Sequence, residues 1–167
     1  MIEKIFRKNF IVNSILVFSI FLFDRLSKIY VIYLDNKFLG SEIFSSNYLN
    51  ITLIWNEGVA FGLLNLEKNY LYNLLTVLII FIIIAIIFMT INTQGLRKYS
   101  LLMILGGALG NVFDRIFTKA VPDFIDFHIG NFHWFIFNIS DVFITLGVFF
   151  MILLEIIGNN KSRNEKI

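Results

Sequence analysis

Long apolar blocks separated by short polar segments run through this 167-residue chain. Four blocks are long enough to cross about 30 Å of hydrocarbon as helices. They cover about residues 10–33, 70–91, 99–116 and 134–157. Residues 48–56 roughly alternate apolar and polar side chains, which predicts a strand. The pattern therefore predicts an all-α membrane protein, a single domain over residues 1–167, with four transmembrane helices and a small β-rich lobe over about residues 35–68.

Composition supports the membrane interpretation. Hydrophobic residues make up 57% of the chain and the mean hydropathy is +0.78, so there is too little polar surface to cover a soluble globule. The net charge is only +2 and the basic residues are scattered, which argues against a nucleic-acid partner. No cysteine occurs, which excludes disulfides, thiolate metal sites and a cysteine nucleophile.

The basic N-terminus followed by an apolar run is similar to a signal peptide. No small-x-small cleavage site follows that run, and apolar residues resume after the charged segment 24–28. We therefore expect an uncleaved first span.

Basic residues suggest the orientation of the spans. They are frequent in segments 1–8, 92–98 and 158–167, so the positive-inside rule places both termini in the cytoplasm and the lobe outside. With four spans, odd spans end and even spans begin on the extracytoplasmic face. Four acidic residues are thereby expected at that face, namely Asp24, Asp114, Asp123 and Asp141.

Two of these acids have a cation close in sequence. Asp24 and Lys28 are four residues apart and share a helix face, which suits an ion pair. Asp114 is followed by Arg115. These two acids are therefore expected to be charge-compensated.

The other two acids lack a clear partner. Asp141 has no cation nearby in sequence, and Lys119 lies four residues from Asp123, but Pro122 makes a shared helix face doubtful. Two unpaired carboxyls held close together share one proton, as in the paired acids of aspartic proteases. Such a pair can activate water and protonate a carbonyl oxygen without a metal.

Five ordered sequence blocks resemble a known family, lipoprotein signal peptidase, also called signal peptidase II. The blocks are DRLSK at 24–28, NEGVAF at 56–61, GGALGNVFDR at 106–115, PDFIDF at 122–127 and FNISD at 137–141. The resemblance implies a four-span fold with an extracytoplasmic β-lobe and a catalytic pair formed by Asp123 and Asp141. It further implies a set of supporting or substrate-contacting residues, namely Asp24, Lys28, Asn56, Gly58, Asn111, Asp114, Arg115 and Asn138.

The same resemblance implies the activity and its setting. The substrate of the family is a membrane-anchored prolipoprotein whose cysteine already carries diacylglycerol, and cleavage falls just before that cysteine. We expect a monomer in the bacterial cytoplasmic membrane, with membrane lipids as partners and neither a cofactor nor a metal. Two positions depart from the family pattern: Ser140 replaces the usual alanine and Pro122 replaces an aliphatic residue. Neither removes a carboxylate.

Three other functions are compatible with some of these residues. A small transporter or proton-relay protein also uses membrane acids, but these acids lie at one leaflet and not along a path across the bilayer. A serine hydrolase using Ser140 with His128 or His133 lacks a GxSxG turn, and HIGNFH is no zincin helix. A purely structural subunit leaves the acids unexplained. The histidines are predicted to be interfacial, while Asp126 fits a surface role and a site role equally well.

Overall fold

The computed structural model describes residues 2–58 and 69–164. This part of the chain forms four helices and a four-stranded sheet. The helices are α1 (Ile2–Lys37), α2 (Asn69–Asn92), α3 (Leu96–Phe117) and α4 (Ile139–Asn164). The strands are β1 (Phe44–Ser45), β2 (Leu49–Asn56), β3 (Val121–Ile129) and β4 (Phe132–Phe137).

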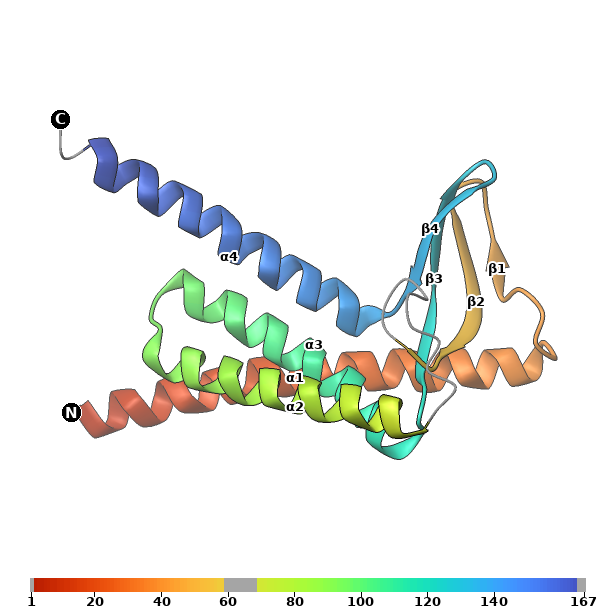
Figure 1. Ribbon diagram of the computed structural model, residues 1–167, viewed down its shortest axis with the longest axis horizontal. Helices are drawn as coiled ribbons and strands as arrows, with labels where there is room; N and C mark the ends of the chain where they lie inside the picture. Colours follow the sequence, from red (N-terminus) through yellow and green to blue (C-terminus); the bar gives the residue numbers. More distant parts are fainter. Residues whose placement is uncertain (1, 59–68, 165–167) are drawn as a thin grey trace.

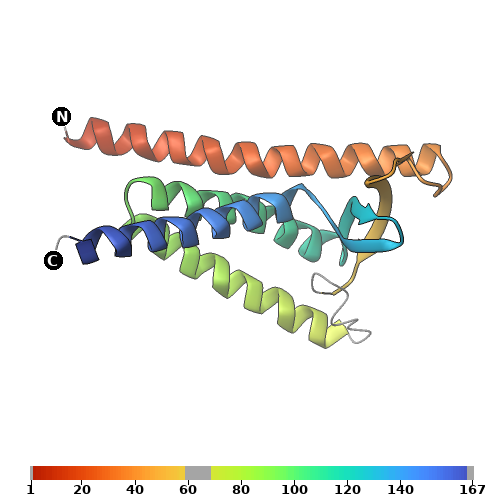
Figure 2. The ribbon, with the colours of Figure 1, turned by 90° about the horizontal axis from the view of Figure 1, so that it is seen from above.

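The sheet lies at one end of the helices (Figures 1 and 2). Its order is β1-β2-β3-β4 and every neighbouring pair is antiparallel. The start of α1 and the end of α4 lie at the opposite end of the molecule (Figure 1). As a result, the ends of α1 and α3 and the start of α4 all approach the sheet.

Three helices in the described part are long and apolar enough to cross a membrane. They are Tyr72–Asn92, Leu96–Phe117 and Ile139–Gly158. The remaining helix, α1, has 36 residues, which is ample length, but Asp24, Arg25 and Lys28 interrupt its apolar sequence. A fourth span through α1 therefore stays a prediction.

The predicted start of the fourth span, at about residue 134, is wrong. Residues Phe132–Phe137 form strand β4, and α4 begins only at Ile139. The segment is rich in aromatic residues, which suit a strand as well as a membrane helix. The segment forms a strand because it pairs with β3 across a turn at Gly130, where φ is +58°.

The predicted extent of the lobe, residues 35–68, also needs correction. Strands β1 and β2 lie within it, but α1 continues to Lys37 and half of the sheet comes from β3 and β4. Apolar side chains occupy both faces of VPDFIDFHI, so the alternation that indicates a half-buried strand is weak there. Residues 59–68 of the predicted lobe, with the second half of the NEGVAF block, lie outside the described residues.

Helix α3 is the centre of the bundle and contacts each of the other helices. Its glycines allow this close packing. A Cβ at Gly106 would lie 2.9 Å from Cβ of Ile20 in α1, and one at Gly107 would lie 2.5 Å from the backbone oxygen of Ser140 in α4. The small-xxx-small pattern predicted at Gly106 and Gly110 thus places α3 directly against its neighbours.

We expect Gly107→Ala to lower the thermal stability of the protein, because the added methyl group meets backbone that cannot turn aside. Overpacking of this kind costs about 1–3 kcal/mol. Gly158→Ala is the matched control, since its Cβ would meet only the flexible end of Arg97 at 3.1 Å. Thermal unfolding of both purified variants in one detergent provides the measurement. Equal Tm values for the two variants would contradict the packing argument.

Candidate active site

A buried ion cluster joins α1 to α3. The ammonium group of Lys28 lies 2.9 Å from Oδ2 of Asp24 and 2.8 Å from Oδ2 of Asp114, and all three side chains are at most 1% exposed. Arg25 approaches Oδ1 of Asp114 at 2.6 Å. Two cations therefore compensate two carboxylates, and the predicted Asp24–Lys28 ion pair is confirmed.

The prediction that Arg115 compensates the charge of Asp114 is wrong. Arg115 is adjacent to Asp114 in a helix, so the two side chains point in directions about 100° apart. The guanidinium of Arg115 instead donates to the backbone oxygens of Asn111 at 3.2 Å and Gly58 at 3.3 Å. Lys28 and Arg25 supply the compensating charge from α1.

Asn111 connects the ion cluster to Asp141, one of the two candidate catalytic acids. Its Oδ1 accepts a hydrogen bond from Lys28 at 3.0 Å, and its Nδ2 donates to Oδ1 of Asp141 at 2.8 Å. The bond from Lys28 orients the amide, so its NH₂ group must face Asp141. Asp141 is thus held from one side by α3.

Asn138 connects the two candidate acids to each other. Its backbone N–H donates to Oδ2 of Asp141 at 3.2 Å, while its side-chain Nδ2 donates to Oδ1 of Asp123 at 2.6 Å. The N–H of Asp141 returns a bond of 3.1 Å to Oδ1 of Asn138. This reciprocal pair is a capping box at the start of α4, so the sequence FNISD caps a helix and joins both carboxylates.

Strand β2 holds Asp123 from the other side. Nδ2 of Asn56 donates to Oδ2 of Asp123 at 2.9 Å, and Oδ1 of Asn56 accepts from the N–H of Gly58 at 2.9 Å. Arg115 binds the oxygen of Gly58, and its second bond to Asn111 closes a ring of contacts. All the residues that the resemblance implicates therefore lie in one connected network, namely Asp24, Lys28, Asn56, Gly58, Asn111, Asp114, Arg115, Asp123, Asn138 and Asp141.

Two contacts of this network were not predicted. One is the bond of Arg25 to Asp114, which adjacency to Asp24 in the sequence could not reveal. The other joins the backbone N–H of Ser140 to Oδ1 of Asp24 at 3.0 Å. Ser140 is fully buried beside Gly110, and a Cβ at Gly110 would overlap the serine hydroxyl. Asp24 therefore anchors the first turn of α4 as well as pairing with Lys28.

The pKa of Asp123 is raised to about 6. Burial is the largest cause, followed by the charge of Asp141; hydrogen bonds from Asn56 and Asn138 and the charge of Lys28 lower it in part. The folded protein thus holds this proton more tightly than the unfolded chain does. The resulting stabilisation is present at acidic pH and is lost as the pH rises through about 6.

The histidines lie elsewhere, on the β3–β4 hairpin. His128 and His133 face each other across the two strands, and Nδ1 of His133 lies 2.8 Å from Oδ2 of Asp126. The hydroxyl of Ser140 has no hydrogen-bond partner within the described part of the chain. The geometry of a serine hydrolase, in which a histidine contacts the nucleophilic hydroxyl, is therefore not formed here.

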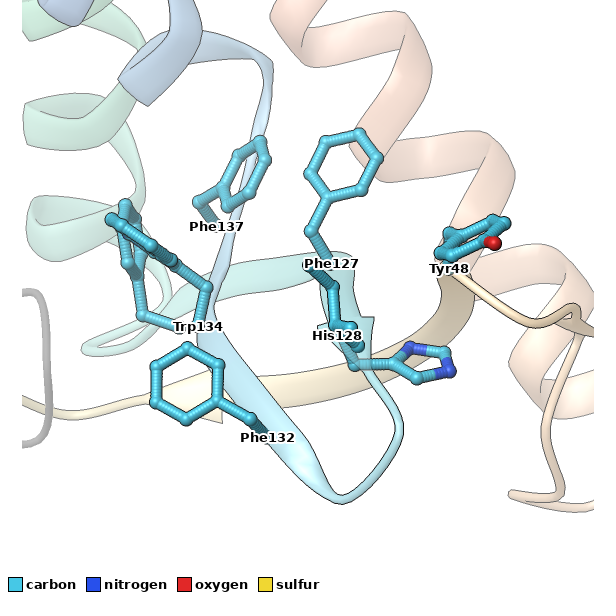
Figure 3. Close-up of a pocket in the computed structure, with 8 residues that line it drawn as sticks. Tyr48, Phe127, His128, Phe132, Trp134 and Phe137 are labelled. Carbon is cyan, nitrogen blue, oxygen red and sulfur yellow. The ribbon is translucent and has the colours of Figure 1, made fainter.

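The same hairpin borders an aromatic pocket of about 460 Å³ (Figure 3). Phe132 and Trp134 lie on one side of it, and the imidazole of His128 points away from them. The pocket is not evident from the sequence, because the aromatic residues of two strands meet only once the hairpin has formed. The pocket does not include Asp123 or Asp141 among its lining residues.

A helical membrane protein in which one asparagine holds two carboxylates together fits the class of aspartic-type membrane peptidases. The family described as signal peptidase (SPase) II matches residues 16–157. This chain belongs to that family.

Relatives and solved structures agree with this assignment. The chain is 48% identical to the lipoprotein signal peptidase of Pelagibacter ubique, covering 98% of this chain and 99% of the relative. It is 36% identical to that of Francisella tularensis subsp. novicida, over 80% of this chain and 87% of the relative. A bacterial membrane enzyme solved by the in meso method at 2.3 Å resolution matches with a TM-score of 0.71 and 28% identity, over 90% of each chain.

Lys28→Met is expected to destabilise the protein, because it leaves Asp24 and Asp114 buried without their shared cation. Breaking a buried ion pair costs about 3–5 kcal/mol. Lys37→Met, an exposed lysine at the end of α1, is the control and should leave Tm nearly unchanged. Adding Asp114→Asn to Lys28→Met should restore part of the loss. The ion cluster would be dispensable if Lys28→Met unfolded at the wild-type temperature.

Proposed function

We propose that this chain removes signal peptides from diacylglyceryl-modified prolipoproteins, cleaving just before the lipidated cysteine, with Asp123 and Asp141 as its catalytic pair. The observation that carries the proposal is the position of Asn138, which donates to both carboxylates at once. The named activity of the relatives supports the substrate class.

The two acids have different tasks in the proposed mechanism. Asp141 lies in the first turn of α4, where the helix N-terminus favours a negative charge. Asp123, whose pKa is raised to about 6, carries the proton. Asp141 is therefore the base and Asp123 the acid of the resting pair.

Hydrolysis then proceeds in two stages. Asp141 takes a proton from water as the water oxygen bonds to the scissile carbonyl carbon, while Asp123 gives its proton to the carbonyl oxygen. The tetrahedral intermediate collapses when Asp123 takes back a hydroxyl proton and Asp141 gives its proton to the leaving nitrogen. The C–N bond breaks, and the pair returns to its starting protonation state. No step requires a cofactor or a metal.

The proposal includes an arrangement in the bacterial membrane. Four helices span it, both termini lie in the cytoplasm, and the catalytic pair and the sheet lie at the extracytoplasmic side. The contacts of α1 with α3, and its course beside the other helices in Figure 2, support α1 as the fourth span. The enzyme acts as a monomer among membrane lipids, and its substrate reaches the pair from within the bilayer.

The transporter alternative is less well supported. A relay across the membrane needs polar groups along its length, whereas α2 has no charged residue from Asn69 to Asn92. The acids Asp24, Asp114, Asp123 and Asp141 all belong to the network at one end of the helices.

We expect Asp123→Asn and Asp141→Asn each to reduce cleavage by at least about a hundredfold, since each removes one partner of the proton exchange. Both variants should still insert in the membrane and retain a wild-type Tm to within a few degrees. The substrate is a diacylglyceryl-modified precursor, compared with its unlipidated form, and Asp35→Asn serves as a control acid on α1. Near-normal cleavage by either catalytic variant would rule out the pair.

The pH profile tests the assignment of the proton. Below pH 6 Asp123 can donate its proton, whereas above it Asp123 has lost that proton, so kcat/KM should fall as the pH rises through about 6. The hydrogen bond from Asn56 lowers this pKa. Asn56→Ala should therefore move the falling limb to higher pH, while Asn36→Ala, at an exposed site on α1, should leave it in place. If the falling limb of Asn56→Ala moved to lower pH instead, the assignment of the proton to Asp123 would be contradicted.

A further inference from the structure

A second polar cluster lies on the β3–β4 hairpin, apart from the catalytic pair. Asp126, His128 and His133 each offer a ligand atom, and these atoms all lie within 4.8 Å of one another. His128 and His133 are cross-strand neighbours whose rings stack with centroids 4.9 Å apart. Asp126 lies two residues before His128 on the same strand, so the three side chains gather at one place on the sheet.

The cluster contains buried polar atoms that no group in the described part of the chain satisfies. Asp126 is only 4% exposed, yet its Oδ1 has no hydrogen-bond partner within the described residues. Nδ1 of His128 is also buried and has no partner there. Only Oδ2 of Asp126 is bound, by His133. Leaving buried polar atoms unsatisfied is destabilising, and the proposed hydrolysis uses none of these groups.

The geometry points to a zinc site formed by Asp126, His128 and His133. Two imidazole nitrogens and one carboxylate oxygen are a common ligand set for Zn²⁺, with a fourth position open to water. Mg²⁺ and Ca²⁺ prefer oxygen ligands, so a site with two imidazoles discriminates against them. Zinc would bind between these side chains and take the place of the direct contact between Asp126 and His133.

Only a small adjustment is needed to bind the ion. Tetrahedral zinc with bonds of about 2.0–2.2 Å places its ligand atoms about 3.3–3.5 Å apart. The side chain of His133 is 52% exposed, so its ring is free to turn out of the stack and toward the ion. Asp126 and His128 are held by β3, which is paired on both sides by β2 and β4. The site therefore has two ligands held by β3, Asp126 and His128, and one exposed ligand, His133, that can turn toward the ion.

The consequence of binding is a clamp between β3 and β4. Strand β3 carries Asp123 and β4 leads directly into Asn138, so the clamp connects the two chain segments whose contact aligns the catalytic pair. The ion takes no part in bond cleavage. Its effect is on the stability of the hairpin, and this effect can be measured without substrate.

The test uses the full-length protein in detergent, stripped with a chelator and then titrated with Zn²⁺. We expect zinc to be retained at one ion per chain and to raise Tm, because a ligand that binds only the folded state stabilises it. Mg²⁺ at the same concentration should leave Tm unchanged. Asp126→Asn and His128→Ala should each weaken zinc binding by at least about tenfold, whereas Glu42→Gln, an exposed acid next to the sheet, should bind as wild type does.

A Tm that zinc does not raise in the wild-type protein, or raises equally in His128→Ala, would overturn the site. If the variants fail to fold, the visible spectrum of Co²⁺ bound to the wild-type protein decides. An intense tetrahedral spectrum supports the site, and a weak octahedral one contradicts it. Because every readout is binding or stability, the result is independent of whether the chain cleaves prolipoproteins.

Discussion

The position of Lys28 between Asp24 and Asp114 is the interaction on which the rest of the site depends. One buried ammonium joins α1 to α3 and, through Asn111, sets the orientation of the amide that faces Asp141. In an apolar environment the carboxylates need cations beside them, Lys28 for both and Arg25 in addition for Asp114, and the buried ammonium in turn needs the carboxylates. Charge compensation and site geometry are therefore achieved by the same contacts.

The second constraint is that the proposed catalytic pair forms where a helix meets a sheet. Asp123 lies on β3, Asp141 lies in the first turn of α4, and Asn138 satisfies both while capping the helix. The pair cannot be aligned before the helix start is formed, because the capping bonds and the bridging bond use the same asparagine. Asp24 adds a further restraint by binding the N–H of Ser140, and Gly110 provides the space for that approach.

The hairpin extends this arrangement beyond the membrane helices. Its two strands carry one of the proposed catalytic acids and lead into the helix that carries the other, so any ligand that holds β3 to β4 acts on the alignment of the pair. The zinc site inferred at Asp126, His128 and His133 occupies that position. The proposed metal-independent hydrolysis and the proposed metal-stabilised hairpin are compatible, because the candidate catalytic acids and the candidate metal ligands are different side chains.

Local features were determined by the sequence alone. The apolar lengths of α2 and α3, the strand at β2 and the ion pair between Asp24 and Lys28 all depend on neighbours within one helical turn or one strand. Only the tertiary structure decided that Phe132–Phe137 is a strand, because its aromatic residues suit both states until β3 pairs with it. It likewise decided that Asp114 binds Lys28 and Arg25 and not Arg115, since adjacent residues of a helix diverge while helices far apart in sequence converge.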